Sequence, residues 1–397
     1  MVTVKEASAT IFSHLFKPAS VRLKLEAATG KVLAGIVVAD RDFPPFHRVS
    51  MDGIAIQFQE WAHGRRTFTI EETQAAGEEQ KKLTDPSHCI EVMTGAILPS
   101  GCDAVIRYED LEIQSNGATI TTDSVSHWQS IHRHAMDARK DQVLLEPGLI
   151  LAPSEVALLA SVGKSEVSVF AFPKVAIIST GDELVDIDVV PSPWQIRRSN
   201  SYALQAAVTD LGGEATCFHL KDEQSTMEKR LKEIVEEYDV LILSGGVSKG
   251  KFDFVPAVLE NTGILKLFHQ VSQRPGKPFW FGRSASGKVA FALPGNPVST
   301  FMCFYRYVKP WILKSLGALP EEVFAVLGTE FSFPSPLTYF LQVSVKNEEG
   351  TLVAYPNPGG GSGDFANLKN VSGFLELPLE QNDFKVGEVF PYISFRH

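Results

Sequence analysis

Three glycine-containing turns, each placed directly after a short apolar run, constrain the fold of this chain more than any other feature. The runs 174–179, 239–243 and 288–293 lead into Thr180-Gly181-Asp182-Glu183-Leu184, Ser244-Gly245-Gly246-Val247-Ser248 and Pro294-Gly295-Asn296-Pro297-Val298-Ser299. Helical patterns alternate with these runs, so the sequence predicts a doubly wound α/β sheet. Loops at the carboxyl ends of parallel strands share one edge, where ligands bind. We therefore expect the three turns to form one site.

A chain of 397 residues is too long for one hydrophobic core, and its patterns predict a multidomain α/β protein. Short alternating strands indicate a β-rich insertion, with strands at 54–58, 66–70, 89–93, 104–108 and 118–122. The predicted domains are an N-terminal linker domain (1–50 and 147–172), the inserted β-rich domain (51–146), the doubly wound α/β domain (173–318) and a small C-terminal β domain (319–397).

Capping residues predict where several helices begin. A capping box, with Ser or Thr three residues before Glu, occurs at Thr3-x-x-Glu6 and at Ser225-x-x-Glu228. Asn296 before Pro297 is typical of an N-cap followed by proline at the first helical position. The first helix is expected over 3–16, with further helices over 154–162 and 202–211.

Composition excludes several classes of protein. The formal net charge of −10 argues against nonspecific nucleic-acid binding, which requires a basic face. No apolar stretch approaches the roughly 18 residues of a membrane span, and the N-terminus lacks the organisation of a signal peptide, so we expect a cytoplasmic protein. The four cysteines show no paired spacing and are expected to be reduced and buried.

Two segments, the turn at 244–248 and the segment 274–277, carry residues suited to binding anions. Glycines at 245 and 246 allow close approach of backbone to a ligand, although the spacing fits neither a P-loop nor GxGxxG, and the alternative is a tight structural turn. Asp253 could bind Mg²⁺ or cap the helix that follows. Arg274-Pro275-Gly276-Lys277 suits a type II turn, and its two cations could also clamp an oxyanion.

Acidic residues and histidines offer possible metal ligands. Asp182 and Glu183 follow a strand, where they could hold a hard cation or complement a helix dipole. His132, His134 and Asp137 have metal-like spacing, but such a stretch more often forms a solvated loop.

Taken together, these segments resemble the molybdopterin molybdenumtransferase family, which includes MoeA and the E domain of gephyrin. The matching segments are 43–46, 50–55, 93–96, 101–105, 179–184, 244–248, 274–278 and 293–299. The resemblance implies Mg²⁺-dependent insertion of molybdate into adenylylated molybdopterin with release of AMP, the final step of molybdenum cofactor biosynthesis. It also implies a homodimer formed through the N-terminal domain. Handover of substrate from molybdopterin adenylyltransferase and of product to apo-molybdoenzymes would follow, with no nucleic-acid or membrane partner.

The resemblance also implies roles for individual residues. Those that would bind the pterin phosphate and the molybdate are Ser244, Gly245, Gly246, Ser248, Arg274, Pro275, Gly276, Pro294, Gly295, Asn296, Ser299 and Ser362. Those that would take part in catalysis are Asp52, Thr94, Asp137, Asp182, Glu183, Asp222, Asp253 and Lys277, and of these Asp52, Asp182 and Glu183 would hold Mg²⁺.

The sequence departs from the family pattern at several positions. Arg274 occupies a position that is usually Lys in the family, and Arg198 one that is usually Asp. The loop 132–137, which is acidic in the family, keeps only its last acid, Asp137. Expected arginines of the C-terminal domain are Leu337 and Gln342. Two other functions therefore stay open, namely adenylylation of molybdopterin and a noncatalytic molybdopterin-binding scaffold or carrier.

Overall fold

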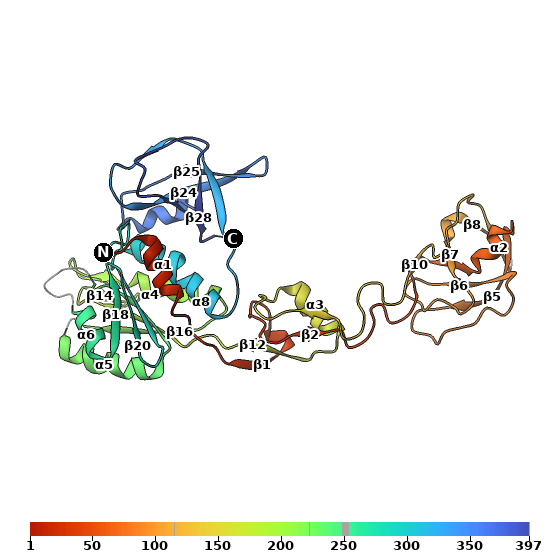
Figure 1. Ribbon diagram of the computed structural model, residues 1–397, viewed down its shortest axis with the longest axis horizontal. Coiled ribbons are helices and arrows are strands. Elements are labelled where there is room, and N and C mark those ends of the chain that lie inside the picture. The colour runs from red at the N-terminus through yellow and green to blue at the C-terminus, as the bar shows by residue number, and fades with distance from the viewer. Residues whose placement is uncertain (115, 222, 248–253, 397) are drawn as a thin grey trace. The chain divides into compact units, whose positions relative to one another are not determined.

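The computed structural model describes residues 1–396 apart from 115, 222 and 248–253, and its internal contacts divide the chain into two compact units (Figure 1). Unit 1 comprises Met1–Ala34, Pro147–Pro153 and Glu166–His397, and unit 2 comprises Gly35–Glu146 and Ser154–Ser165. Each unit is described by itself below. The finer division into four domains stays a prediction.

Unit 1 contains the doubly wound sheet, as the alternation of strands and helices predicts. Its strand order is β16-β13-β17-β21-β20-β18. The bounds are β13 Val175–Thr180, β16 Ala215–Leu220, β17 Val240–Ser244, β18 Ile264–His269, β20 Trp280–Ser284 and β21 Val289–Leu293. The first four in space are parallel, β20 runs antiparallel to them, and the edge strand β18 is antiparallel to β20 and so runs in the direction of the first four. The three predicted runs are confirmed as β13, β17 and β21.

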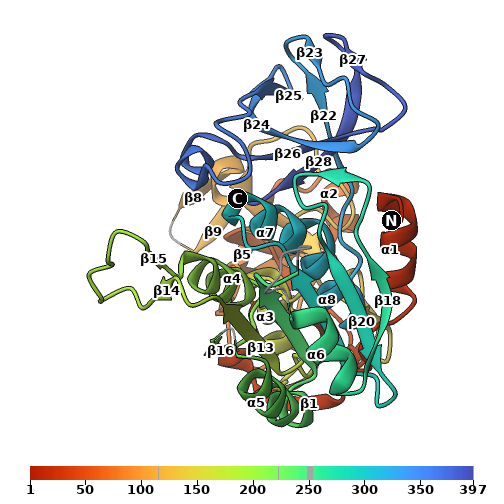
Figure 2. The same ribbon diagram turned by 90° about the vertical axis from the view of Figure 1, so that its left-hand side faces the viewer.

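Side chains of these strands alternate between two hydrophobic cores, as the period of a strand requires. Ile177 and Ile242 point to the core that contains Phe291, whereas Ile178 and Leu243 point to the opposite core. The first core is covered by α1 Val4–Phe12, α4 Ser199–Asp210, α7 Pro297–Cys303, a π-helical turn Phe304–Val308 and α8 Lys309–Ser315. The second is covered by α5 Gln224–Glu237 and α6 Val255–Asn261, which lie close together in Figure 2.

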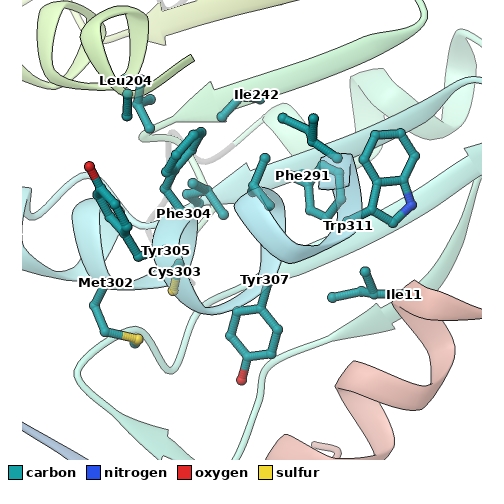
Figure 3. Packing of buried hydrophobic residues seen from close by; sticks show 14 of the residues in the cluster. Ile11, Leu204, Ile242, Phe291, Met302, Cys303, Phe304, Tyr305, Tyr307 and Trp311 are labelled. Atoms are coloured by element: carbon teal, nitrogen blue, oxygen red, sulfur yellow. The ribbon is translucent and has the colours of Figure 1, made fainter. Parts of the chain in front are cut away.

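The N-terminal helix α1 packs into the first core rather than forming a separate element. The predicted capping box of Thr3 and Glu6 is present. The helix ends at Phe12, four residues before the predicted end, because the next residues bind α8: Trp311 Nε1 donates to the His14 carbonyl at 2.9 Å. Figure 3 shows Ile11 of α1 beside Trp311 and Tyr307.

Two other predicted helix starts differ in detail. The N-cap of α5 is Glu223, so the predicted capping box at Ser225 is wrong: Ser225 and Thr226 lie in the first turn and donate to the Glu223 carboxylate. Asn296 is the N-cap of α7 as predicted, but its side chain makes no capping bond. Asn296 Nδ2 donates instead to Ser362 Oγ at 2.8 Å.

The C-terminal part of unit 1 is a small barrel, seen as the blue strands of Figure 2. Its strands pair in the closed order β24-β25-β22-β28-β26-β24. The bounds are β22 Val323–Leu327, β24 Thr338–Glu348, β25 Thr351–Pro356, β26 Gly373–Leu377 and β28 Val389–Ser394, with a short pair β23 Phe331–Ser332 and β27 Asp383–Phe384. The strand β19 Gln273–Arg274 pairs with β24, and Arg306 pairs with Glu376 of β26 at 2.6 Å. These contacts join the barrel to the α/β sheet.

Unit 2 is built on a six-stranded sheet of order β7-β4-β6-β5-β9-β8. The bounds are β4 Gly53–Ile56, β5 Thr67–Gln74, β6 His88–Val92, β7 Ala104–Arg107, β8 Leu111–Gln114 and β9 Gly117–Ile120. All five predicted strands are confirmed, whereas β8 and the helix α2 Phe58–Ala62 were not predicted. The helix α3 Pro153–Ser161 matches its prediction within one residue.

Short two-stranded pairs complete the chain. They are β1 Ser20–Lys24 with β12 Glu166–Phe170, β2 Val37–Val38 with β11 Val143–Leu145, β3 Arg48–Val49 with β10 Ile131–His132, and β14 Leu184–Val185 with β15 Ile196–Arg197. All four cysteines are free thiols, and three are buried while Cys217 is half-buried. Within the described ranges, no helix is long and apolar enough to cross a membrane.

Candidate ligand-binding site at the carboxyl edge of the sheet

A pocket of about 360 Å³ lies at the carboxyl ends of β13, β17 and β21. The chain runs from β13 to β16 on one side and then to β17 on the other, so the strand order reverses between β13 and β17. Ligands of doubly wound sheets bind at this reversal. The pocket is lined by residues 179–181, 183, 184, 196–201, 244–247, 278 and 294–297. The three turns thus line one pocket, as predicted for the carboxyl edge of the sheet.

The side chain of Asn200 connects these turns. Its Nδ2 donates to Gly295 O at 2.8 Å, to Ser244 Oγ at 3.0 Å and to Thr300 Oγ1 at 3.3 Å. Ser244 is 3% exposed, and its hydroxyl accepts from Asn200, so its own proton is available to a ligand. Asn200 was not predicted as a site residue, because nothing in its local sequence signals contacts to turns 44 and 95 residues away.

The two glycines after β17 are required by the backbone. Gly245 and Gly246 have φ of +101° and +67°, a region that favours glycine. A Cβ on Gly246 would lie 2.6 Å from Val255 Cγ2, and one on Gly245 would lie 3.0 Å from Thr180 O. The turn therefore packs tightly against β13 while its backbone lines the pocket. The glycines are thus needed for a tight structural turn, and the same turn leaves backbone exposed to a ligand in the pocket.

The acidic turn after β13 contributes one carboxylate to the pocket. Glu183 lines it and folds over Gly181, where a Cβ would meet Glu183 Oε2 at 2.4 Å. Asp182 is exposed and is not among the lining residues. In the described ranges no group of three or more His, Cys, Asp or Glu residues could hold a metal ion. Any cation at this edge would need ligand oxygens as well.

A clamped arginine adds positive charge to the pocket. Arg198, which lines it, donates to the Asp186 carboxylate through Nη2 at 2.5 Å and Nε at 3.4 Å. Tyr202 OH donates to the same carboxylate at 3.0 Å. The backbone N–H of Ile187 and the donors of Tyr202 and Arg198 lower the pKa of Asp186.

The turn with two cations, 274–278, is fixed by a buried network. Gln273 Nε2 donates to Gly276 O at 3.0 Å, and Tyr307 OH donates to Gln273 Oε1 at 2.5 Å. Gly276 has φ of +92°, and a Cβ there would lie 2.7 Å from Cys303 Sγ. Arg274 and Lys277 are exposed, and the guanidinium of Arg274 lies 5.7 Å from the ring centroid of Phe333.

The other residues assigned to this part of the site lie around that turn and α7. Pro278 lines the pocket, whereas Arg274, Pro275, Gly276 and Lys277 do not. Ser299 is 3% exposed within α7 and does not line the pocket either. Ser362 is held beside the pocket by its bond to Asn296.

The site residues assigned to the insertion lie in unit 2. Asp52 Oδ1 accepts from the Thr94 backbone N–H at 2.6 Å, and this bond lowers the pKa of Asp52. Asp137 is paired with His132 at 2.7 Å.

The loop 132–137 forms two separate pairs rather than one cluster. His134 pairs with Asp42 at 3.0 Å, away from the pair of His132 and Asp137. This agrees with the prediction of a solvated loop. Three further assigned residues, Asp222, Ser248 and Asp253, lie outside the described residues.

Comparison with family models identifies the class of protein. The MoeA N-terminal region (domain I and II) matches residues 2–163, the probable molybdopterin binding domain matches 176–314, and the MoeA C-terminal region (domain IV) matches 325–395. The second match contains the pocket and all three turns. The fold and its site define a protein of molybdenum cofactor biosynthesis with a molybdopterin-binding α/β domain.

Full-length relatives identify the family. The chain is 40% identical over 399 residues to the molybdopterin molybdenumtransferase of Synechocystis sp., with 100% of both chains covered. It is 30% identical over 400 residues to that of Staphylococcus aureus, covering 99% of this chain and 95% of the relative. The crystal structure of the MoeA protein of Pyrococcus horikoshii OT3 matches with a TM-score of 0.86 at 28% identity, covering 100% of both. The chain belongs to the molybdopterin molybdenumtransferase family, a family of transferases.

Proposed function

We propose that this chain catalyses the Mg²⁺-dependent insertion of molybdate into adenylylated molybdopterin, with release of AMP. The observation that carries the proposal is the pocket at the strand reversal, in which glycine turns from three strands converge within the domain matched as molybdopterin-binding. A phosphorylated ligand suits this pocket, because backbone N–H groups, a serine hydroxyl and arginine side chains line it.

The serine and glycines after β17 would hold the phosphate part of the substrate. Asn200 donates to Ser244 Oγ and so leaves the Ser244 proton for a phosphate oxygen. The absence of side chains at Gly245 and Gly246 allows a phosphate to approach the backbone. Cleavage of an anhydride requires mainly that negative charge is neutralised and that the attacking oxygen is held in line, and no protein nucleophile is needed.

The described acids fit a Mg²⁺ ion that is held partly by the substrate. Mg²⁺ in phosphoryl-transfer sites usually binds one or two carboxylates and completes its shell with phosphate oxygens and water. Glu183 lines the pocket and Asp182 is its neighbour, so these two would hold the ion. When bound, the ion would neutralise charge on the anhydride.

The turn 274–278 would bind molybdate. Its conformation is fixed by the buried hydrogen bonds of Gln273 and Tyr307. Arg274 and Lys277 are exposed and so available to a dianion. Arg can donate to two oxygens, and Lys acts as a point charge.

AMP release tests the proposal directly. Purified protein is given adenylylated molybdopterin and Mg²⁺, with or without molybdate, and the product is used to reactivate a cofactor-free molybdoenzyme. We expect molybdate-dependent AMP release and reactivation, both lost in Lys277→Ala and kept in Lys346→Ala, an exposed lysine of the barrel. Unchanged turnover in Lys277→Ala would refute the molybdate assignment.

Two outcomes would replace the proposed function. Tight substrate binding without AMP release would favour a carrier, and consumption of ATP without molybdate would favour molybdopterin adenylylation.

We also propose that the protein is a cytoplasmic homodimer that receives its substrate from an adenylyltransferase and passes product to apo-molybdoenzymes. Light scattering of the purified protein tests the dimer, and a monomer at micromolar concentration would refute it.

A further inference from the structure

Arg198 is a positive charge placed inside the pocket rather than on the open surface. It is the N-cap residue of α4 and lines the pocket, and its side chain is 19% exposed. Its neighbours in the chain, Arg197 and Ser199, also line the pocket. Among the described lining residues the ionised side chains are two guanidiniums and the carboxylate of Glu183. The lining thus carries two guanidiniums and one carboxylate, and Asp186, which does not line the pocket, pairs with Arg198.

The guanidinium of Arg198 is held in one orientation. Asp186 accepts from its Nη2 and Nε, and Asp186 is itself held by Tyr202 OH at 3.0 Å and by the Ile187 N–H at 2.9 Å. Tyr202 belongs to α4, so the helix supports the clamp. A guanidinium has five N–H donors. Two of those of Arg198 bond Asp186, and the guanidinium also lies against the Tyr202 hydroxyl; within the described part of the chain it makes no hydrogen bond to the three turns.

The field of Arg198 reaches the ends of the central strands. Burial lowers the pKa of His219 on β16, and the charge of Arg198 lowers it further. His219 Nδ1 is 3.1 Å from Ser179 Oγ, at the end of β13. Burial raises the pKa of the half-buried Cys217 thiol of β16, and the charge of Arg198 opposes that rise. Arg198 is therefore close enough to β16 to act on two of its side chains, and one of these, His219, contacts Ser179 near the end of β13.

We propose that Arg198 binds the phosphate oxygens of the phosphoanhydride substrate directly, with Asp186 and Tyr202 as positioning residues for its guanidinium. This inference rests on the proposed function and adds to it a substrate-binding residue. Arginine binds phosphate through two parallel N–H groups when one of its edges is free.

Equilibrium binding separates this inference from the proposed function. Binding of adenylylated molybdopterin is measured by calorimetry without molybdate and without Mg²⁺, and KM and kcat for AMP release are measured separately. For Arg198→Ala we expect Kd and KM to rise about 10- to 100-fold, with a smaller change in kcat. Arg198→Lys should restore part of the affinity, because it keeps the charge but loses the planar donor geometry. Asp186→Asn should raise KM by a smaller factor.

Arg230→Ala is the matched control, since Arg230 is an exposed arginine paired with Glu233 on α5. It should bind as the wild-type protein does. A Kd for Arg198→Ala within twofold of the wild-type value, or equal losses in Arg198→Lys and Arg198→Ala, would overturn the inference. Wild-type protein that binds the substrate through Arg198 but releases no AMP would refute the proposed function alone.

Discussion

Removing the Asn200 amide should loosen the turns of the pocket. Its Nδ2 carries two N–H groups and contacts three acceptors, on Ser244, Gly295 and Thr300. A hydrogen bond contributes about 1 kcal/mol net, so Asn200→Ala should lower the free energy of unfolding of unit 1 by about 2 kcal/mol. For a unit as large as unit 1 that corresponds to a fall in Tm of about 3–4 °C. Asn200→Asp should cost at least as much, because a carboxylate oxygen would face Gly295 O.

The assay for Asn200 combines thermal unfolding with hydrogen exchange. Exchange should accelerate at 244–247 and 294–296, and substrate affinity should fall. Gln205→Ala is the matched control, since Gln205 lies on the same helix and its amide makes one bond, to Ala215 O at 3.1 Å. Its cost should be about 1 kcal/mol, with no change in the pocket. Equal Tm in Asn200→Ala and wild type, or faster exchange only around Ala215, would show that the three contacts do not hold the turns.

Three further predictions concern neighbouring parts of unit 1. Glu376→Ala leaves the largely buried Arg306 unpaired and should destabilise unit 1 by about 3 kcal/mol. The double variant Arg306→Met with Glu376→Met removes both charges and should destabilise it clearly less. Equal losses in the denaturant midpoint of the two variants would contradict this. Gly246→Ala, whose Cβ would clash with Val255, should weaken substrate binding at least tenfold in calorimetry and lower Tm. The pKa of Asp186 is lowered in the folded protein, so its ionised carboxylate stabilises the fold above the ordinary carboxyl range, and this contribution is lost as pH falls below about 4. In Asp186→Asn, Tm should therefore fall less steeply with decreasing pH than in the wild-type protein. An unchanged dependence of Tm on pH would contradict this.

Three neighbouring strands of the sheet, β13, β17 and β21, could be predicted because each is a short apolar run followed by a glycine-containing turn. The shared site followed from that, since parallel strands place their turns at one edge. The three hydrogen bonds of the Asn200 amide could not be predicted, because the register of β17 and β21 brings its partners together. Nor could the clamp of Arg198 by Asp186, which depends on the short pair β14 and β15.

Helix ends were predicted wrongly where a contact distant in sequence or a competing hydrogen-bond acceptor determines the end of the helix. The first helix was predicted too long, because the contact that ends it is made with Trp311, 297 residues from His14. The capping box at Ser225 failed because the nearby Glu223 carboxylate accepts from the hydroxyls of the first turn.

The contact of α1 with α8 also bears on how the protein is made. A ribosome adds about 5–20 residues per second, so the 297 residues between His14 and Trp311 correspond to about 15–60 s of synthesis. Unit 2 ends at Ser165 and can form during that time, while the apolar face of α1 stays uncovered. The apolar face of α1 therefore stays exposed on the nascent chain until the segments that pack against it have emerged. A chain terminated before Trp311 would lack the contacts of α1 with α8, and we expect it to be a substrate for chaperones or proteases.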